Sequence, residues 1–228
     1  MRLTLLIFLV STLVLTAQNE SGIIAMKNGE EITFYDGSNS DEEKTIYGMY
    51  ATRFRSIAWD MDDLFYFAKS GEIIKLKQKE IKTINFNDSE YTYFTGPHYK
   101  KKAIRMHRLI AQNDKYVLGY YSASNGEYLY IFSLEGELVK RRLGVYGRSE
   151  YGVKYGKNNL KKLYKVLPEY FPNCTELYDK IKHNAELFNN DTSWRYRFGG
   201  DIFSVWDKSD KPDKELRDKS FIGNIICN

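Results

Sequence analysis

The middle of the chain reads NDKYVLGYYSASNGEYLYIFSLEG from Asn113 to Gly136. Three turn dipeptides, Asn113-Asp114, Asn125-Gly126 and Glu135-Gly136, divide this segment into apolar and aromatic runs. Short runs between tight turns are typical of an antiparallel meander, in which each strand pairs with the next one along the chain. We therefore predict that the segment forms consecutive antiparallel strands.

The same alternation of apolar runs and turns extends over residues 18–156 and predicts a β-rich body. The predicted strands are Gly22–Lys27, Glu31–Tyr35, Lys44–Tyr50, Arg53–Trp59, Leu64–Ala68, Glu72–Lys77, Ile81–Phe86, Tyr91–Thr95, Ala103–Ala111, Tyr116–Ser122, Glu127–Leu134 and Glu137–Leu143.

One predicted strand has no polar face. The side chains of Tyr128, Tyr130 and Phe132 alternate with those of Leu129 and Ile131, so the strand should be covered on both sides, with helices as one cover. The aromatic side has two interpretations. It either lines a groove on which a sugar ring or an aromatic peptide side chain stacks, or it fills a barrel-like core, which is the commoner outcome.

After Gly156 the apolar period becomes that of a helix. A first helix, with Asn158 or Asn159 as its N-cap, should be kinked or restarted by Pro168, and a second should begin at Asn173, which has capping-box spacing to Glu176. The apolar stripe of the first helix is Leu160, Leu163, Tyr164, Leu167 and Phe171.

The two cysteines, Cys174 and Cys227, predict one disulfide if the chain reaches an oxidising compartment. A third helix is expected to start at Asp210 and, if it persists, to carry Cys227 on the same face as Leu216. A reactive thiol at Cys174 is the alternative, but the available partner and the absence of Cys-x-x-Cys spacing favour a structural bridge.

Composition favours a folded, strand-rich protein. The chain of 228 residues is 43% hydrophobic and has 19 Tyr and 13 Phe against 4 Pro, which excludes disordered and collagen-like classes. We predict the α+β class: an antiparallel β-meander, barrel-like or strongly twisted, followed by C-terminal helices packed on it. Residues 18–228 should form a single domain, with a β-rich body at 18–156 and a helical part at 157–228.

The first seventeen residues have the features of a secretory signal peptide. A cationic start at Arg2 precedes the uncharged run Leu3–Leu15, and small residues lead to a cleavage site between Ala17 and Gln18. This uncharged run is too short for a membrane-spanning helix. No uncharged apolar run in the mature chain is longer than it. Because no cysteine lies near the site, we expect a periplasmic or extracellular protein that is not a lipoprotein.

The sequence contains no recognised catalytic or cofactor motif. His98, His107 and His183 lack metal-ligand spacing, and the acidic turn Asp60–Asp63 lacks the glycine and the distal glutamate of a calcium loop. Hydrolase-elbow and phosphate-loop patterns are absent. We therefore assign no catalytic residue, metal or cofactor.

Basic residues form three local groups, Lys100–Lys102 with Arg105 and Arg108, Lys140–Arg142, and Lys161–Lys165. On neighbouring strand ends they could form a patch for acidic glycans or lipid headgroups. Scattered solvated positions are the favoured interpretation, because the net charge is only +4. Nucleic acid is not an expected partner, since no binding module is recognised.

Three segments resemble uncharacterised secreted proteins common in Bacteroidota. They are GIIAMKNGEEI (residues 22–32), SGEII (70–74) with its partner at Glu80-Ile81, and LPEYFPNCTELYDKI (167–181), together with the cysteine-containing tail 224–228. The resemblance implies a periplasmic or exported location and a strand-rich body capped by helices, but no catalytic residues. The chain departs from those proteins in a long aromatic segment, residues 185–211.

The leading functional hypothesis is a non-enzymatic, exported binding protein that contacts a cell-envelope component: a glycan, a lipid headgroup or a protein. The alternative is a small secreted hydrolase acting on glycans or peptides with an acid/base pair that leaves no local motif. A concave pocket holding two carboxylates, or a histidine beside a serine or an aspartate, would favour the hydrolase.

Overall fold

The computed structural model describes residues 19–37, 57–59, 62–87, 91–98, 103–123, 126–149, 152–154, 157–190 and 222–228. Four predictions lie wholly or largely outside these residues: the signal peptide with its cleavage site at Ala17 and Gln18, the strand Lys44–Tyr50, the aromatic segment 185–211, and the third helix up to its last turn.

The described strands form one twisted, open sheet, in the order β12-β11-β10-β9-β8-β7-β6-β1-β2-β4-β3, with β5 paired to β4 and β13 to β8. Its antiparallel meander confirms the predicted α+β class, and β2 and β6 have the predicted bounds. The strands are β1 (Glu20–Met26), β2 (Glu31–Tyr35), β3 (Ile57–Trp59), β4 (Asp63–Phe67), β5 (Ile73–Lys77), β6 (Ile81–Phe86), β7 (Thr92–Pro97), β8 (Ile104–Gln112), β9 (Tyr116–Ala123), β10 (Gly126–Ser133), β11 (Leu138–Ser149), β12 (Gly152–Lys154) and β13 (Ile225–Ile226), with a short 3₁₀ turn, η1 (Gln78–Glu80).

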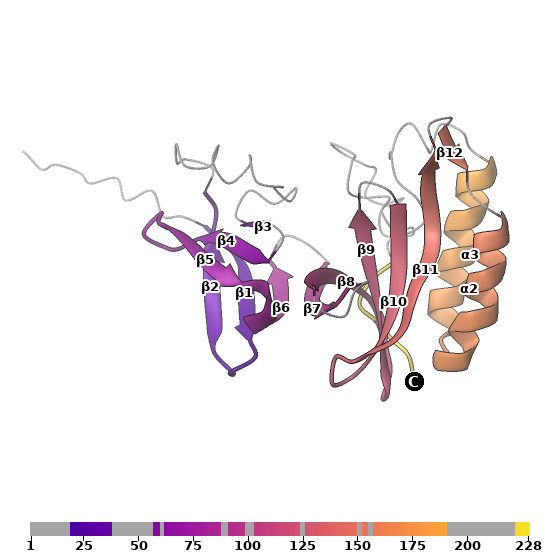
Figure 1. The fold of residues 1–228 in the computed structure, drawn as a ribbon, viewed down its shortest axis with the longest axis horizontal. Helices are drawn as coiled ribbons and strands as arrows, with labels where there is room; N and C mark the ends of the chain where they lie inside the picture. Colours follow the sequence, from indigo (N-terminus) through magenta and orange to yellow (C-terminus); the bar gives the residue numbers. More distant parts are fainter. Residues whose placement is uncertain are drawn as a thin grey trace, which may run out of the picture.

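Two helices, α2 (Lys157–Tyr170) and α3 (Thr175–Asn190), cover one face of the sheet at its β9–β11 end, and strands β1 to β6 lie away from them (Figure 1). The predicted helical period is confirmed by Leu163 and Leu167, which are buried in the core together with Phe171 just after the helix, whereas Tyr164 of the predicted stripe is exposed. Pro168 lies inside α2, which ends two residues later. No helix within the described ranges is long and apolar enough to cross a membrane.

The start of α3 lies one residue later than predicted. The Cys174 carbonyl accepts the first helical hydrogen bond, from the Tyr178 amide at 3.3 Å, so Cys174 and not Asn173 occupies the N-cap position. A turn after α2 causes this shift, because the Cys174 amide donates to the Phe171 carbonyl at 3.4 Å. The predicted capping box of Asn173 and Glu176 is therefore wrong.

Strand β10 is buried on both sides, as its sequence predicts. Leu129 and Ile131 are fully buried in a core cluster with the apolar stripes of α2 and α3. On the opposite side Tyr130 is 1% exposed and Phe132 is 0% exposed, and their neighbours include Phe94 of β7. A separate core cluster, which includes Ile24, Phe34 and Ile84, lies mostly within strands β1 to β6 and extends to Met106 of β8.

The tail that carries Cys227 is extended and not helical, which corrects the prediction of a persistent third helix. Ile225 pairs in parallel with Ala111 of β8, on the edge of β8 that β7 leaves uncovered. Asn224 adopts a positive φ of 53°, and its amide donates to the Leu109 carbonyl at 3.3 Å. The open backbone groups of β8 compete successfully with helix continuation at this point.

Candidate binding pocket

Cys174 and Cys227 form a disulfide with their Cα atoms 4.8 Å apart, across a sequence separation of 53. The bridge joins the start of α3 to the tail, and the Cys227 amide donates to the Gln112 carbonyl of β8 at 2.7 Å. The end of β8, the junction of α2 with α3, and the tail are thereby brought together at one point of the fold.

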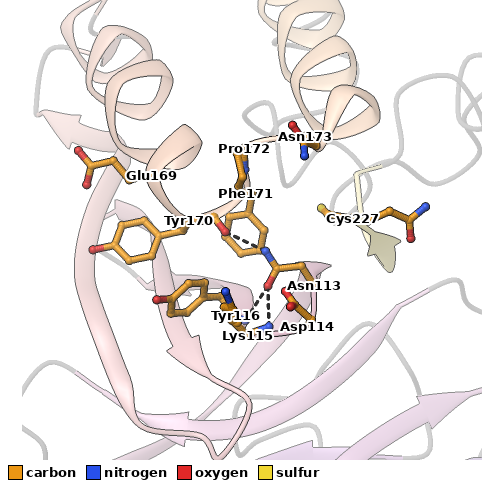
Figure 2. A pocket seen from close by; sticks show the side chains of 11 residues that line it. Asn113, Asp114, Lys115, Tyr116, Glu169, Tyr170, Phe171, Pro172, Asn173 and Cys227 are labelled. Atoms are coloured by element: carbon orange, nitrogen blue, oxygen red, sulfur yellow. Dashed lines mark hydrogen bonds between the residues drawn. The ribbon is translucent and has the colours of Figure 1, made fainter.

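A cavity of about 340 Å³ opens at this point (Figure 2). Three segments line it: the β8–β9 turn at 113–116, the α2–α3 junction at 169–173, and the tail residues 227–228. Each of the three segments comes from a different part of the chain, so the cavity exists only in the folded protein. None of its lining residues was predicted as a site residue, except Cys227 as half of the disulfide.

Asn113 organises the cavity through three hydrogen bonds. Its Oδ1 accepts from the backbone amides of Lys115 at 2.9 Å and Tyr116 at 2.7 Å, which shapes the turn. Its Nδ2 donates to the Tyr170 carbonyl at the end of α2 at 2.8 Å. This carbonyl is one of those that a helix leaves without an internal partner, so Asn113 both caps α2 and ties it to the sheet.

Two tyrosines form one wall of the cavity. The rings of Tyr116 and Tyr170 pack edge to face with centroids 5.1 Å apart. Figure 2 shows both hydroxyl groups pointing to the side where Glu169 lies, away from Cys227. Both tyrosines are partly buried and belong to the residues that line the cavity.

The α2–α3 junction is rigid behind these rings. Phe171 is fully buried, and its carbonyl accepts a 2.8 Å hydrogen bond from the hydroxyl of Tyr178 on α3. Burial raises the pKa of Tyr178, so this hydroxyl keeps its proton at neutral pH. The helix pair therefore holds the cavity wall independently of any ligand.

The charged groups of the cavity lie at its rim. Asp114, Lys115 and Glu169 are all exposed and carry both signs of charge. Among the described residues that line the cavity there is no histidine, serine or free thiol, and Cys227 is engaged in the disulfide. Two carboxylates are present, which is the feature that the hydrolase hypothesis requires, although neither is buried.

The predicted aromatic face lies elsewhere, on the side of β10 that the helices do not cover. Tyr128 is partly buried, whereas Tyr130 and Phe132 are buried and pack around His107 with ring-centroid distances of 5.1 and 4.9 Å. A stacking site needs an accessible ring face, and these two rings present none in the structure. The face as a binding surface stays a prediction.

His107 of β8 is fully buried among aromatic rings, including that of His98 at 6.2 Å. Burial, and to a lesser degree the neighbouring His98, lowers the pKa of His107 to about 3, although the Gly96 backbone opposes this shift. Neither ring nitrogen makes a hydrogen bond of good geometry. His107 is therefore neutral at physiological pH, while His183 is exposed on α3.

The acidic turn is a set of ion pairs. Asp63 contacts Lys75 at 2.7 Å and Lys77 at 2.6 Å, and Asp62 contacts Arg105 at 3.1 Å, while Asp60 lies outside the described residues. Hydrogen bonds from the two lysines lower the pKa of Asp63. Within the described ranges no group of three or more histidine, cysteine or acidic side chains could hold a metal ion.

Arg108 does not belong to a surface patch, which corrects its grouping with the basic cluster. Its guanidinium is buried between the rings of Tyr91 and Tyr120, 4.7 and 4.6 Å from their centroids. Lys140, Lys161, Lys162 and Lys165 are exposed, whereas Lys100–Lys102 and the side chains of Arg141 and Arg142 lie outside the description.

The chain matches no family model, no curated protein and no solved structure.

Proposed function

We propose that the protein is a non-enzymatic, exported binding protein of the cell envelope and that the cavity between the β8–β9 turn and the α2–α3 junction is its ligand site. The observation that carries the proposal is the cavity itself, whose shape is set by the Asn113 hydrogen bonds and by the disulfide. Preformed concave sites with aromatic walls and a few polar groups are typical of ligand binding.

Export is supported by three observations. The disulfide suits an oxidising compartment, the first seventeen residues have the charge and hydropathy pattern of a signal peptide, and three segments resemble secreted proteins of Bacteroidota. The proposal therefore places the protein in the periplasm or outside the cell and takes an envelope component as its ligand.

Retention of envelope fractions tests this function. The full chain is produced with export in a Gram-negative host, so that Ala17–Gln18 can be cleaved and the disulfide can form, and the purified protein is immobilised. We expect retention of one envelope fraction among glycan, lipid and peptide fractions, and no retention after the cavity is disrupted by Asn113→Ala. If the wild-type column retains no more of any fraction than a column without protein, the proposed binding function is wrong.

The two rim carboxylates give a second candidate function, hydrolysis of a glycan by Asp114 and Glu169. A general acid usually needs an apolar environment that keeps it protonated, and both groups are exposed, so binding without turnover is the better supported function. Release of reducing ends from envelope glycan that disappears in both Asp114→Asn and Glu169→Gln would establish the hydrolase instead.

A further inference from the structure

We propose that the cavity recognises a neutral pyranose unit, such as an N-acetylhexosamine residue of a glycan. This inference rests on the proposed binding function and names the ligand class of the same site. It follows from the division of the cavity into an uncharged interior and a polar rim.

The interior of the cavity offers aromatic and apolar surface without charge. Phe171 and Cys227 are buried, and Asn113, Tyr116 and Tyr170 are half-buried. The Asn113 carboxamide is already engaged by two backbone amides and one carbonyl. The interior offers an ionic ligand no buried counter-charge to offset the hydration it would lose, which favours a neutral ligand there.

The rim supplies hydrogen-bond donors and acceptors of both kinds. Asp114 and Glu169 carry acceptors, and Lys115 and Asn173 carry donors, all of them exposed around the opening. The rim carries both signs of charge, two carboxylates and one ammonium group, and all three are exposed to solvent. Hydroxyl and amide groups on the edge of a neutral ligand can pair with either kind.

A pyranose ring has the shape that this division requires. One of its faces presents C–H groups that can lie on a tyrosine ring, while its hydroxyl groups project outward from the edge. An aromatic peptide side chain has apolar faces but at most one polar group on its edge, so it would leave most of the rim unpaired. The sugar therefore fits both parts of the cavity.

The tyrosine wall is preorganised for such a ligand. The turn that Asn113 caps fixes the backbone of Tyr116, and the hydrogen bond from Asn113 to the Tyr170 carbonyl fixes the end of α2. Their edge-to-face contact restrains both rings relative to each other. Little side-chain freedom remains to be lost on binding, which favours affinity.

Backbone amide NMR of the oxidised full-length protein tests the ligand class. Chitobiose and maltose are titrated as probes, with choline as a cationic probe and N-acetyltyrosinamide as an aromatic one. We expect a disaccharide to shift the amides of Lys115 and Tyr116, which report directly on the cavity turn, whereas choline and N-acetyltyrosinamide leave them in place.

A matched pair of variants ties the shifts to the tyrosine wall. Tyr170→Leu should weaken disaccharide binding about tenfold, because it removes one stacking ring. Tyr164→Leu changes the same residue type on the same helix at an exposed position outside the cavity, with 41% of the residue exposed, and should bind as the wild type does. Circular dichroism melting confirms that both variants fold.

The outcomes separate the two proposals. Cavity shifts with choline or N-acetyltyrosinamide, and none with either disaccharide, would overturn the sugar inference and leave the binding function standing. Disaccharide binding that Tyr170→Leu and Tyr164→Leu weaken equally would also overturn it, since the wall would not be the contact. Failure of all four probes, together with no retention of any envelope fraction, would remove both proposals.

Discussion

The side-chain amide of Asn113 donates a hydrogen bond to the Tyr170 carbonyl across 2.8 Å, although the two residues are 57 positions apart. This single contact links a turn of the β-meander to the end of a C-terminal helix. It therefore connects the β-rich body to the helical part of the chain at the place where the cavity opens.

Asn113→Ala should destabilise the fold by about 2 kcal/mol, because three hydrogen bonds disappear, two of them partly buried, and the end of α2 loses its cap. Urea unfolding measures the effect. Asn28→Ala is the matched control: Asn28 also accepts a local bond from a backbone amide, that of Glu30 at 3.0 Å, but reaches no distant element. Its cost should be below about 1 kcal/mol, and equal losses would mean that the link to α2 contributes nothing.

Removing the disulfide should lower the free energy of unfolding by as much as about 4 kcal/mol, the chain-entropy value for a loop with a sequence separation of 53. Guanidinium unfolding of the wild type with and without reductant measures this. The Cys174→Ala, Cys227→Ala double variant should have the same free energy of unfolding as the reduced wild type, and reductant should not change it. Hydrogen exchange of the backbone amide at position 227 should rise in both samples, because the bridge holds the tail against β8. Unchanged protection there would show that β13 pairs without the bridge.

The protein should lose stability as the pH falls below about 6.5, through His107. The pKa of His107 lies at about 3 in the folded state against an ordinary value of 6.5, so between these pH values the unfolded chain binds a proton that the folded protein does not bind. At pH 4.5 this difference amounts to about 2–3 kcal/mol relative to pH 8. His107→Phe should remove that component from the pH dependence measured by urea unfolding.

The control for this pH effect disturbs the same cluster without removing the imidazole. Phe132→Leu should lower stability at every pH, because Phe132 is fully buried, but should keep the slope of the wild type between pH 6.5 and 4.5. If His107→Phe and the wild type show the same slope, the histidine is protonated in the folded state and its assigned neutrality is wrong.

Gly119→Ala should cost about 1–3 kcal/mol, because an added Cβ would lie 2.7 Å from Cζ of Phe94 and 3.0 Å from Cε2 of Phe132. Phe94→Leu removes the nearest of these contacts. In a double-mutant cycle followed by thermal unfolding, Gly119→Ala should therefore cost less in the Phe94→Leu background. Strictly additive losses of stability would show that the Phe94 ring does not clash with the added Cβ at position 119.

Much of the meander could be predicted from local pattern. Turn dipeptides such as Glu135-Gly136 and the alternation of side chains between them located most of the described strands, because a hairpin is specified by residues close together in the chain. The burial of β10 on both sides was also readable, since Leu129 and Ile131 leave no polar face between the aromatic residues.

Wrong predictions arose where distant groups compete with local preference. Cys227 satisfied a helical stripe, but the free edge of β8 offers its backbone amide the Gln112 carbonyl, so the tail is extended. Arg108 was interpreted as a surface charge, but Tyr120 of β9 and Tyr91, the residue before β7, enclose its guanidinium. Neither outcome leaves a signal near the residue itself.

The amino-acid sequence by itself determined the strand-rich meander, the helical period after Gly156 and the presence of two cysteines able to pair, since each depends on residue type and spacing along the chain. Only the tertiary structure decided where the pocket lies. The sequence identifies Asn113 only as a turn residue, whereas in the structure its hydrogen bond to the Tyr170 carbonyl joins two walls of the cavity. Hydrogen bonding across such a separation depends on how the sheet and helices pack, which local preference does not encode.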